Sequence, residues 1–199
     1  MTPLKIGITG GIGSGKTTIT YLLEQKGYLV YFADARAKWL MQNDSTLVKQ
    51  LKDLLGADIY TTTGELNKQL VARRVFENST LLQKMNAIVH PAVKLDFFSW
   101  VQQNQKEKFL FKEAAILLEA QTQDQIDFSV LVYAPKKIRM QRVTNRDNVD
   151  FIHVLHRMNQ QWPERLKYNY VDYIIFNDNI HSLEKQVVEL LNFLHKQFG

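Results

Sequence analysis

Short apolar runs alternate with amphipathic stretches along this chain. The runs lie at residues 4–9, 28–32, 109–111, 128–133 and 173–176. Nearly continuous apolar runs are typical of strands in a parallel sheet that is covered on both faces. Helical spacing follows the first run at residues 17–26 and the second at 33–42. Five strands in alternation with helices predict a doubly wound α/β sheet.

The segment between the second and third strands has no convincing strand pattern. Helical spacing is found at residues 47–55, 67–76 and 81–89. His90-Pro91 predicts the start of a further helix, to about residue 105, because proline is tolerated in a first turn. We therefore expect a helical insertion that carries substrate contacts.

The last predicted helix covers residues 182–197. Its apolar residues form one stripe, which we interpret as core packing rather than a partner surface: Leu183, Val187, Leu190, Leu191 and Leu194. No stripe in the chain clearly exceeds what one core would use, so the oligomeric state stays open.

A glycine-rich segment directly follows the first predicted strand. Residues Gly10–Thr17 fit the pattern G-x-x-x-x-G-K-[ST] of a phosphate-binding loop. In that arrangement the backbone N–H groups point inward and a helix begins at its positive end. Lys16 would reach the β- and γ-phosphates, and the Thr17 hydroxyl would ligate Mg²⁺. The alternative, a glycine-rich turn without a ligand, is disfavoured by the strand and helix that flank it. The pattern predicts that a nucleoside triphosphate binds at Gly11, Gly13, Ser14, Gly15, Lys16, Thr17 and Thr18.

Composition narrows the class of protein only slightly. The formal net charge is +5, but the basic residues are scattered, which does not indicate a nucleic-acid footprint. A polyanionic small substrate and a surface with a few extra lysines explain this balance equally well. The chain has no cysteine, no secretory pattern and no apolar stretch of about 20 residues that could span a bilayer. We expect a cytoplasmic protein without a membrane partner.

An acidic residue follows the second predicted strand. In a parallel sheet, Asp34 and the phosphate-binding loop would both emerge at the carboxyl ends of their strands. If those strands are neighbours, the carboxylate would face the γ-phosphate and orient an acceptor hydroxyl. The alternative is that Asp34 caps a helix that begins at Ala35. The residues alone favour neither.

Three arginines share one face of a predicted helix, because they lie three and four residues apart: Arg139, Arg142 and Arg146. Their guanidinium groups would repel one another unless an anion lay among them. This favours a lid that closes over ATP, with an arginine stabilising charge on the transferred phosphoryl group. A solvent-exposed basic helix is the alternative.

These residues together resemble the dephospho-coenzyme A kinase family along nearly the whole chain. The matching residues are Gly7–Thr18, Ala33-Asp34, Gly64-Glu65-Leu66-Asn67, Arg74-Val75-Phe76, His90-Pro91, Leu117-Leu118-Glu119, Arg142, Arg146-Asp147, Gln161, Lys167, Asp172–Ile175 and Asn177. The glycine loop alone is shared by many kinases, whereas the ordered set is far more specific.

The resemblance implies a three-layer α/β/α P-loop kinase fold with a five-stranded parallel sheet. It implies a nucleotide-binding core (residues 1–60, 107–138 and 169–199), a helical coenzyme A-binding insertion (61–106) and a helical lid (139–168). It also implies transfer of the ATP γ-phosphate to the ribose 3′-hydroxyl of dephospho-coenzyme A, with Mg²⁺, as the final step of coenzyme A biosynthesis.

The resemblance also assigns roles to residues. Asp34, Lys16, Arg142 and Arg146 would be catalytic, and the two arginines would also contact ATP. The acceptor substrate would be bound by Asp34, Lys68, Arg74, His90, Glu119 and Gln161. Thr17 would bind magnesium.

The chain departs from the family pattern at three positions. Phe32 replaces the first acid of the usual Asp-Ala-Asp, Ala115 replaces a proline, and Lys68 replaces an arginine. Lysine at residue 68 keeps the charge and loses bidentate geometry.

Two other functions share some of these features. A nucleoside or nucleotide kinase would have the loop, the acid and the lid, but a different acceptor region. A nucleotide-dependent regulatory or nucleic-acid-binding protein would need a basic recognition face, and would not need Asp34.

Overall fold

The computed structural model describes residues 2–76, 78–120 and 122–199. The chain forms two compact units. Met1–Phe32 and Asn104–Gly199 make up the first, which we call the sheet unit, and Ala33–Gln103 make up the second, the helical unit.

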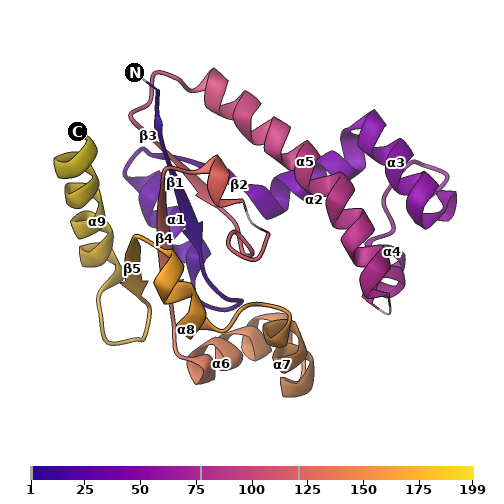
Figure 1. The fold of residues 1–199 in the computed structure, drawn as a ribbon. Coiled ribbons are helices and arrows are strands. Elements are labelled where there is room, and N and C mark those ends of the chain that lie inside the picture. Colours follow the sequence, from indigo (N-terminus) through magenta and orange to yellow (C-terminus); the bar gives the residue numbers. More distant parts are fainter. Residues whose placement is uncertain (1, 77, 121) are drawn as a thin grey trace. The chain divides into compact units, whose positions relative to one another are not determined.

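The sheet unit contains five parallel strands within the described residues (Figure 1). These are β1 (Leu4–Thr9), β2 (Leu29–Phe32), β3 (Phe109–Glu113), β4 (Phe128–Tyr133) and β5 (Tyr173–Phe176). Their order is β2-β3-β1-β4-β5. The predicted α/β class and all five predicted strands are confirmed.

Helices and one main apolar core complete the sheet unit. The helices are α1 (Lys16–Gln25), α6 (Lys136–Asp147), α7 (Phe151–Asn159), α8 (Glu164–Lys167) and α9 (Leu183–Phe198), with the 3₁₀ turns η2 (Gln123–Gln125) and η3 (Tyr168–Tyr170). The inward face of α9 buries Val187, Leu190, Leu191 and Leu194 in the same cluster as the β-strand residues Ile6 and Ile8. The predicted apolar stripe of the last helix is thus core packing.

Close packing also covers β1 at Gly7. A Cβ atom there would lie 2.6 Å from Ile126 Cδ1 and 2.9 Å from Leu117 Cδ1. The segment that follows β3 therefore packs directly against the backbone of the central strand, and a side chain at residue 7 would displace Ile126 and Leu117.

The helical unit is built from α2 (Ala33–Asn43), α3 (Ser45–Leu55), α4 (Lys68–Phe76) and α5 (Ser79–Gln103), with the 3₁₀ turn η1 (Ala57–Ile59). The predicted helical region is present. The prediction of a helix start at His90-Pro91 is wrong, since α5 runs through Pro91 without interruption.

Burial explains why α5 continues through the proline. Proline removes one helical hydrogen bond and crowds the preceding turn. However, Val89, Val93, Phe97 and Val101 lie four residues apart, and all are buried. This stripe crosses Pro91, so packing of the helix outweighs the local cost.

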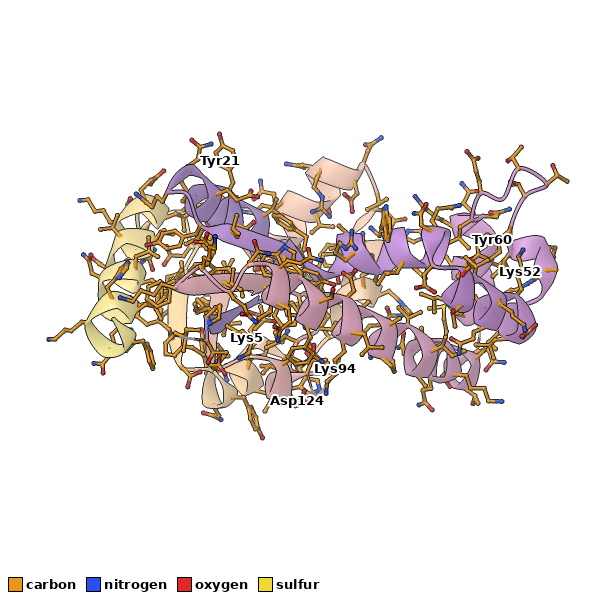
Figure 2. All side chains as sticks on the ribbon, turned by 90° about the horizontal axis from the view of Figure 1, so that it is seen from above. Lys5, Tyr21, Lys52, Tyr60, Lys94 and Asp124 are labelled. Atoms are coloured by element: carbon orange, nitrogen blue, oxygen red, sulfur yellow. The ribbon has the colours of Figure 1, made fainter. Side chains whose placement is uncertain are left out.

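Specific contacts join the helices within this unit. The Arg36 guanidinium of α2 donates to the Asp96 carboxylate of α5, with Nε 2.9 Å from Oδ2. Lys52 of α3 lies over the ring of Tyr60, 5.2 Å from its centroid (Figure 2). The resemblance implies a nucleotide-binding core that includes residues 33–60. In the structure these residues belong to the helical unit, because α2 and α3 pack with α5.

Within the described residues, none of the helices combines the length and apolar character needed to cross a membrane.

Candidate active site

The phosphate-binding loop connects β1 to α1. Gly13 and Gly15 adopt left-handed backbone conformations, with φ of 78° and 94°. Gly15 is the N-cap of α1 and provides no side-chain hydrogen bond to the helix. The first amides of α1 therefore have no side-chain cap and can donate to an anion. The Ser14 hydroxyl is buried in the same loop without a hydrogen-bond partner.

Lys16 points into this loop from the first turn of α1. Its Nζ donates to the Gly10 carbonyl at 2.8 Å and lies 3.8 Å from Glu113 Oε1. Both side chains are largely buried, with exposed fractions of 9% and 12%. The lysine is thus held beside the loop, where its charge can act on a bound phosphate.

Glu113 was missed by the sequence reasoning. It ends β3, which is the strand next to β1, and lies level with Ile8 in the paired register. A signal was present: an acidic residue closes the apolar run that begins at Phe109. No second acid follows Glu113, and the strand order that places it beside Lys16 cannot be read from the sequence.

The condition that would place Asp34 opposite the γ-phosphate, direct pairing of β1 with β2, is not met. β3 lies between them and pairs with both. The reason is that β3 follows the helical unit in the sequence but lies between β1 and β2, which both precede that unit.

Asp34 lies in the first turn of α2. That helix begins at Ala33 and not at Ala35, so Asp34 is not the N-cap residue that the alternative reading requires. Its side chain is exposed. A carboxylate in a first turn still has a favourable interaction with the helix dipole.

Arg142 lies against the loop on the side of β5. Its Nη2 donates to Asn177 Oδ1 at 3.0 Å and to Asn179 Oδ1 at 2.7 Å, while Asn177 Nδ2 donates to the Ser14 carbonyl at 2.8 Å. A Cβ atom on Gly15 would lie 3.8 Å from Arg142 Nη1, which is buried without a hydrogen-bond partner. Burial lowers the pKa of this guanidinium below its usual range. Arg142 therefore keeps a donor available beside the loop.

The other two arginines of the predicted face have different surroundings. Arg139 is buried, and its Nε donates to the Ala134 carbonyl at 3.1 Å. Arg146 is exposed and donates to the neighbouring Asp147, with Nε 2.7 Å from Oδ1. Each has its own partners, so the expectation that the three charges need a shared anion is wrong.

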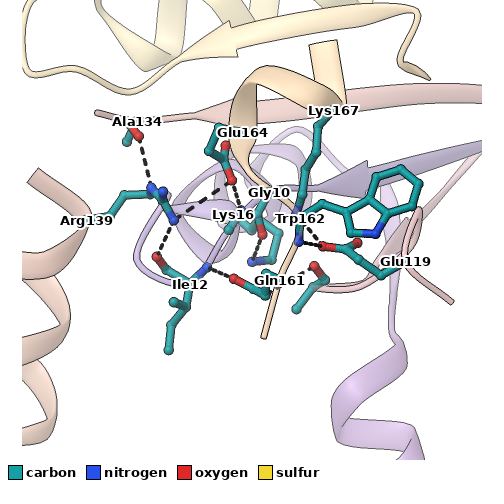
Figure 3. A network of polar contacts seen from close by, with 12 residues as sticks. Gly10, Ile12, Lys16, Glu119, Ala134, Arg139, Gln161, Trp162, Glu164 and Lys167 are labelled. Carbon is teal, nitrogen blue, oxygen red and sulfur yellow. Dashed lines mark hydrogen bonds and ion pairs between the residues drawn. The ribbon is translucent and has the colours of Figure 1, made fainter. Parts of the chain in front are cut away.

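Two predicted substrate-binding residues lie near the loop, in the network drawn in Figure 3. Gln161 Oε1 accepts from the Ile12 amide at 2.8 Å. Glu119 Oε1 accepts from the Trp162 amide at 3.0 Å and lies 2.8 Å from Lys167 Nζ. Both side chains thus have partners within the sheet unit, and their contact with substrate stays a prediction.

The remaining predicted substrate-binding residues belong to the helical unit. Lys68 is exposed at the start of α4, and His90 is half-buried within α5. Arg74 of α4 makes an ion pair with Asp58, with Nη1 2.8 Å from Oδ1, and this lowers the pKa of that carboxyl. The contact fixes α4 against η1, and the substrate roles of all three stay predictions.

The loop offers oxygen donors suited to magnesium. Mg²⁺ prefers oxygen ligands, and at phosphate sites it usually takes one or two groups from the protein. The exposed Thr17 and the acid Glu113 at the end of the adjacent strand are such groups. The part of the chain that the structure describes holds no cluster of three or more acidic, histidine or cysteine side chains that could bind a metal by itself. The residues therefore fit an ion held mainly by nucleotide phosphates and water.

Comparisons with known protein sequences point to a family of kinases, as the phosphate-binding loop does. The family model described as dephospho-CoA kinase matches residues 4–182. A dephospho-CoA kinase of Bacteroides fragilis is 37% identical over 98% of this chain and 94% of its own length. One from Salinibacter ruber is 35% identical over 93% of this chain and 94% of its own length.

Solved structures show the same fold. A Thermus thermophilus protein has a TM-score of 0.85 at 31% identity, with complete coverage of both chains. A shikimate kinase from Acinetobacter baumannii has a TM-score of 0.52 at 14% identity, over 100% of this chain and 97% of its own. The second likeness concerns the fold alone. With the family model spanning nearly the whole sequence and relatives above one-third identity, the chain belongs to the dephospho-CoA kinase family.

Proposed function

We propose that this protein transfers the γ-phosphoryl group of ATP to the ribose 3′-hydroxyl of dephospho-CoA and so produces CoA. The family match over residues 4–182 supports the reaction and its substrates. The observation that carries the chemistry is the loop itself, an uncapped helix start with the buried cation of Lys16 beside it. The protein is a phosphotransferase, and this reaction is the last step of CoA biosynthesis.

The loop residues would bind the triphosphate of ATP through backbone amides at the start of α1. Phosphoryl transfer depends mainly on positioning and on neutralising charge. Lys16 is already fixed at 2.8 Å from the Gly10 carbonyl, and Arg142 is fixed by Asn177 and Asn179. Little reorganisation of these cations is then needed when charge develops on the transferred group.

We propose that Thr17 and Glu113 hold Mg²⁺ together with the phosphates. The ion would neutralise the β- and γ-oxygens when bound. The protein's part is to offer a hydroxyl near the start of α1 and a carboxylate at the end of β3.

Asp34 is proposed as the group that orients the acceptor hydroxyl and takes its proton. The support is its position after the second strand, together with the family pattern in which it stands. The family pattern likewise supports a contact of Arg146 with ATP. It also supports contacts with the acceptor by four further residues: Lys68, Arg74, His90 and Glu119. Residues 61–106 are proposed as the acceptor-binding insertion and 139–168 as the lid.

An acceptor panel tests this proposal. The protein with ATP and Mg²⁺ is incubated with dephospho-CoA, adenosine, AMP or shikimate at equal concentration, and ADP release and product mass are measured. We expect ADP release with dephospho-CoA and a product heavier by one phosphoryl group. Preference for adenosine or AMP would favour a nucleoside or nucleotide kinase. If no acceptor is phosphorylated, the protein is not a kinase of these acceptors, and a nucleotide-dependent binding protein is favoured instead.

A further inference from the structure

The outer half of the phosphate-binding loop is held by side chains from another part of the chain. The Gly11 amide donates to Glu164 Oε1 at 2.9 Å, and the Ile12 amide donates to Gln161 Oε1 at 2.8 Å. Figure 3 shows Gln161 and Glu164 reaching the loop from the segment that follows α7. These two amides are therefore satisfied by the protein, which leaves the inner half of the loop to bind phosphate.

Packing joins the same half of the loop to the α6 and α7 helices. The Ile12 side chain packs against a small cluster formed by Val143, Val154 and Met158. Val143 lies on α6, and the other two lie on α7. The loop thus shares a core with these helices, separate from the main core of the sheet.

Arg139 adds a third connection. Its Nη1 donates to the Ile12 carbonyl at 3.4 Å and lies 3.9 Å from Glu164 Oε1. Arg139 and Glu164 are 7% and 8% exposed. A buried pair of this kind is costly to break, because removing one partner leaves the other charge buried alone.

Close approach of these side chains requires glycine at residue 11. A Cβ atom there would lie 2.5 Å from Glu164 Oε1 and would also overlap the Arg139 guanidinium. A larger residue at position 11 would therefore displace the Arg139 and Glu164 side chains from the loop.

We propose that Gln161 and Glu164 are positioning residues for ATP. They hold the outer half of the loop in its curved form before the nucleotide binds, and they couple the loop to α6, α7 and α8. This rests on the proposed use of the loop for ATP. It differs from the sequence-based expectation that Gln161 contacts the acceptor.

Gln161→Ala separates these two roles, with Gln160→Ala as the matched control on the exposed neighbouring residue. Loss of one hydrogen bond that shapes the loop should raise the KM for ATP about 3- to 10-fold. The KM for dephospho-CoA should stay within about 2-fold, and the control should behave as the wild type in both. A rise in the KM for dephospho-CoA alone, or no change in either constant, would overturn the proposal.

Glu164 is tested by a pair of variants, because Glu164→Ala also leaves the buried Arg139 without its counter-charge. Glu164→Gln keeps an oxygen acceptor for the Gly11 amide and should retain ATP binding better than Glu164→Ala, by about 3-fold or more. Equal defects in the two variants would contradict a role through that hydrogen bond.

Hydrogen exchange gives a readout that does not depend on the acceptor. The Gly11 and Ile12 amides should be protected in the ATP-free wild type, and the Ile12 amide should lose protection in Gln161→Ala. ATP binding by calorimetry completes the test even if dephospho-CoA is not the substrate. Unprotected amides in the wild type would reject the positioning role, whereas failure with dephospho-CoA alone would reject only the proposed acceptor.

Discussion

At the scale of single residues, the site depends on charges held close to backbone amides. Lys16 is buried between the Gly10 carbonyl and Glu113, and Arg142 is fixed by two asparagines. Placing cations in fixed positions before the reaction is the main way a protein can stabilise the charge that develops during phosphoryl transfer.

Lys16→Ala tests this arrangement. We expect kcat to fall about 10²- to 10³-fold, since one preorganised charge is lost. The melting temperature should fall as well, because Glu113 loses a buried cationic neighbour. Lys26→Ala, on the exposed end of α1, is the matched control and should keep wild-type turnover. Turnover near the wild-type rate in Lys16→Ala would exclude this loop as the site of the reaction.

Asp34→Asn tests the proposed base. ATP binding should be retained, while phosphoryl transfer should fall about 10²- to 10⁴-fold, because the amide cannot take a proton from the acceptor hydroxyl. Single-turnover kinetics and nucleotide titration measure the two effects separately. Asp53→Asn, at an exposed position of α3 in the same unit, is the control. If Asp34 only supports the first turn of α2, both variants should have similar rates.

At the scale of elements, the sequence predicts what forms locally and fails where distant segments meet. The apolar runs predicted the five strands found in the described residues, and helical spacing predicted α1, α2, α3, α4 and α9 to within a few residues. The insertion of β3 between β2 and β1 depends on pairing across the whole helical unit, which no local pattern records. Continuity of α5 through Pro91 likewise depends on burial of Phe97 and its neighbours.

In the site, too, local patterns could be predicted and contacts between distant segments could not. The loop, Lys16 and Thr17 could be predicted because their pattern is local. Glu113, Asn179 and Glu164 could not, because their function depends on which strand or helix end the fold brings to the loop. Arg139 was predicted to share one helix face with Arg142 and Arg146, yet its guanidinium donates to the Ala134 and Ile12 carbonyls instead.

Asp147 connects α6 to α7 through a pH-sensitive contact. Hydrogen bonds from Arg146 and Arg157 lower the pKa of this carboxyl from 3.8 to about 2. Because the native pKa lies below the ordinary value, the ionised group stabilises the fold above about pH 4, and this contribution is lost as the pH falls toward 2.

Asp147→Asn should therefore lower the free energy of unfolding by about 1 kcal/mol at pH 7, since the partners are partly exposed. Denaturant titrations at pH 7, 4 and 3 should show the difference from the wild type shrinking as the pH falls. A difference that stays constant over this range would show that the carboxylate charge is not the cause. Asp53→Asn again provides the comparison on an exposed helix surface.

At the scale of the whole molecule, the two units divide the proposed work. The sheet unit carries the loop and its cations, while the helical unit carries Asp34, Lys68, Arg74 and His90. The fold is shared with a shikimate kinase, so the fold by itself does not determine the acceptor. Choice of acceptor must then come from residues outside the loop, so the function is best tested at the acceptor hydroxyl.

The most direct measurement compares dephospho-CoA with its 3′-deoxyribose analogue, which lacks only the proposed acceptor hydroxyl. With ATP and Mg²⁺, we expect ADP release and a new ribose 3′-phosphate, detected by ³¹P NMR, from dephospho-CoA and no phosphorylated product from the analogue. Phosphorylation of the analogue at a similar rate, or failure to phosphorylate dephospho-CoA itself, would contradict the proposed reaction.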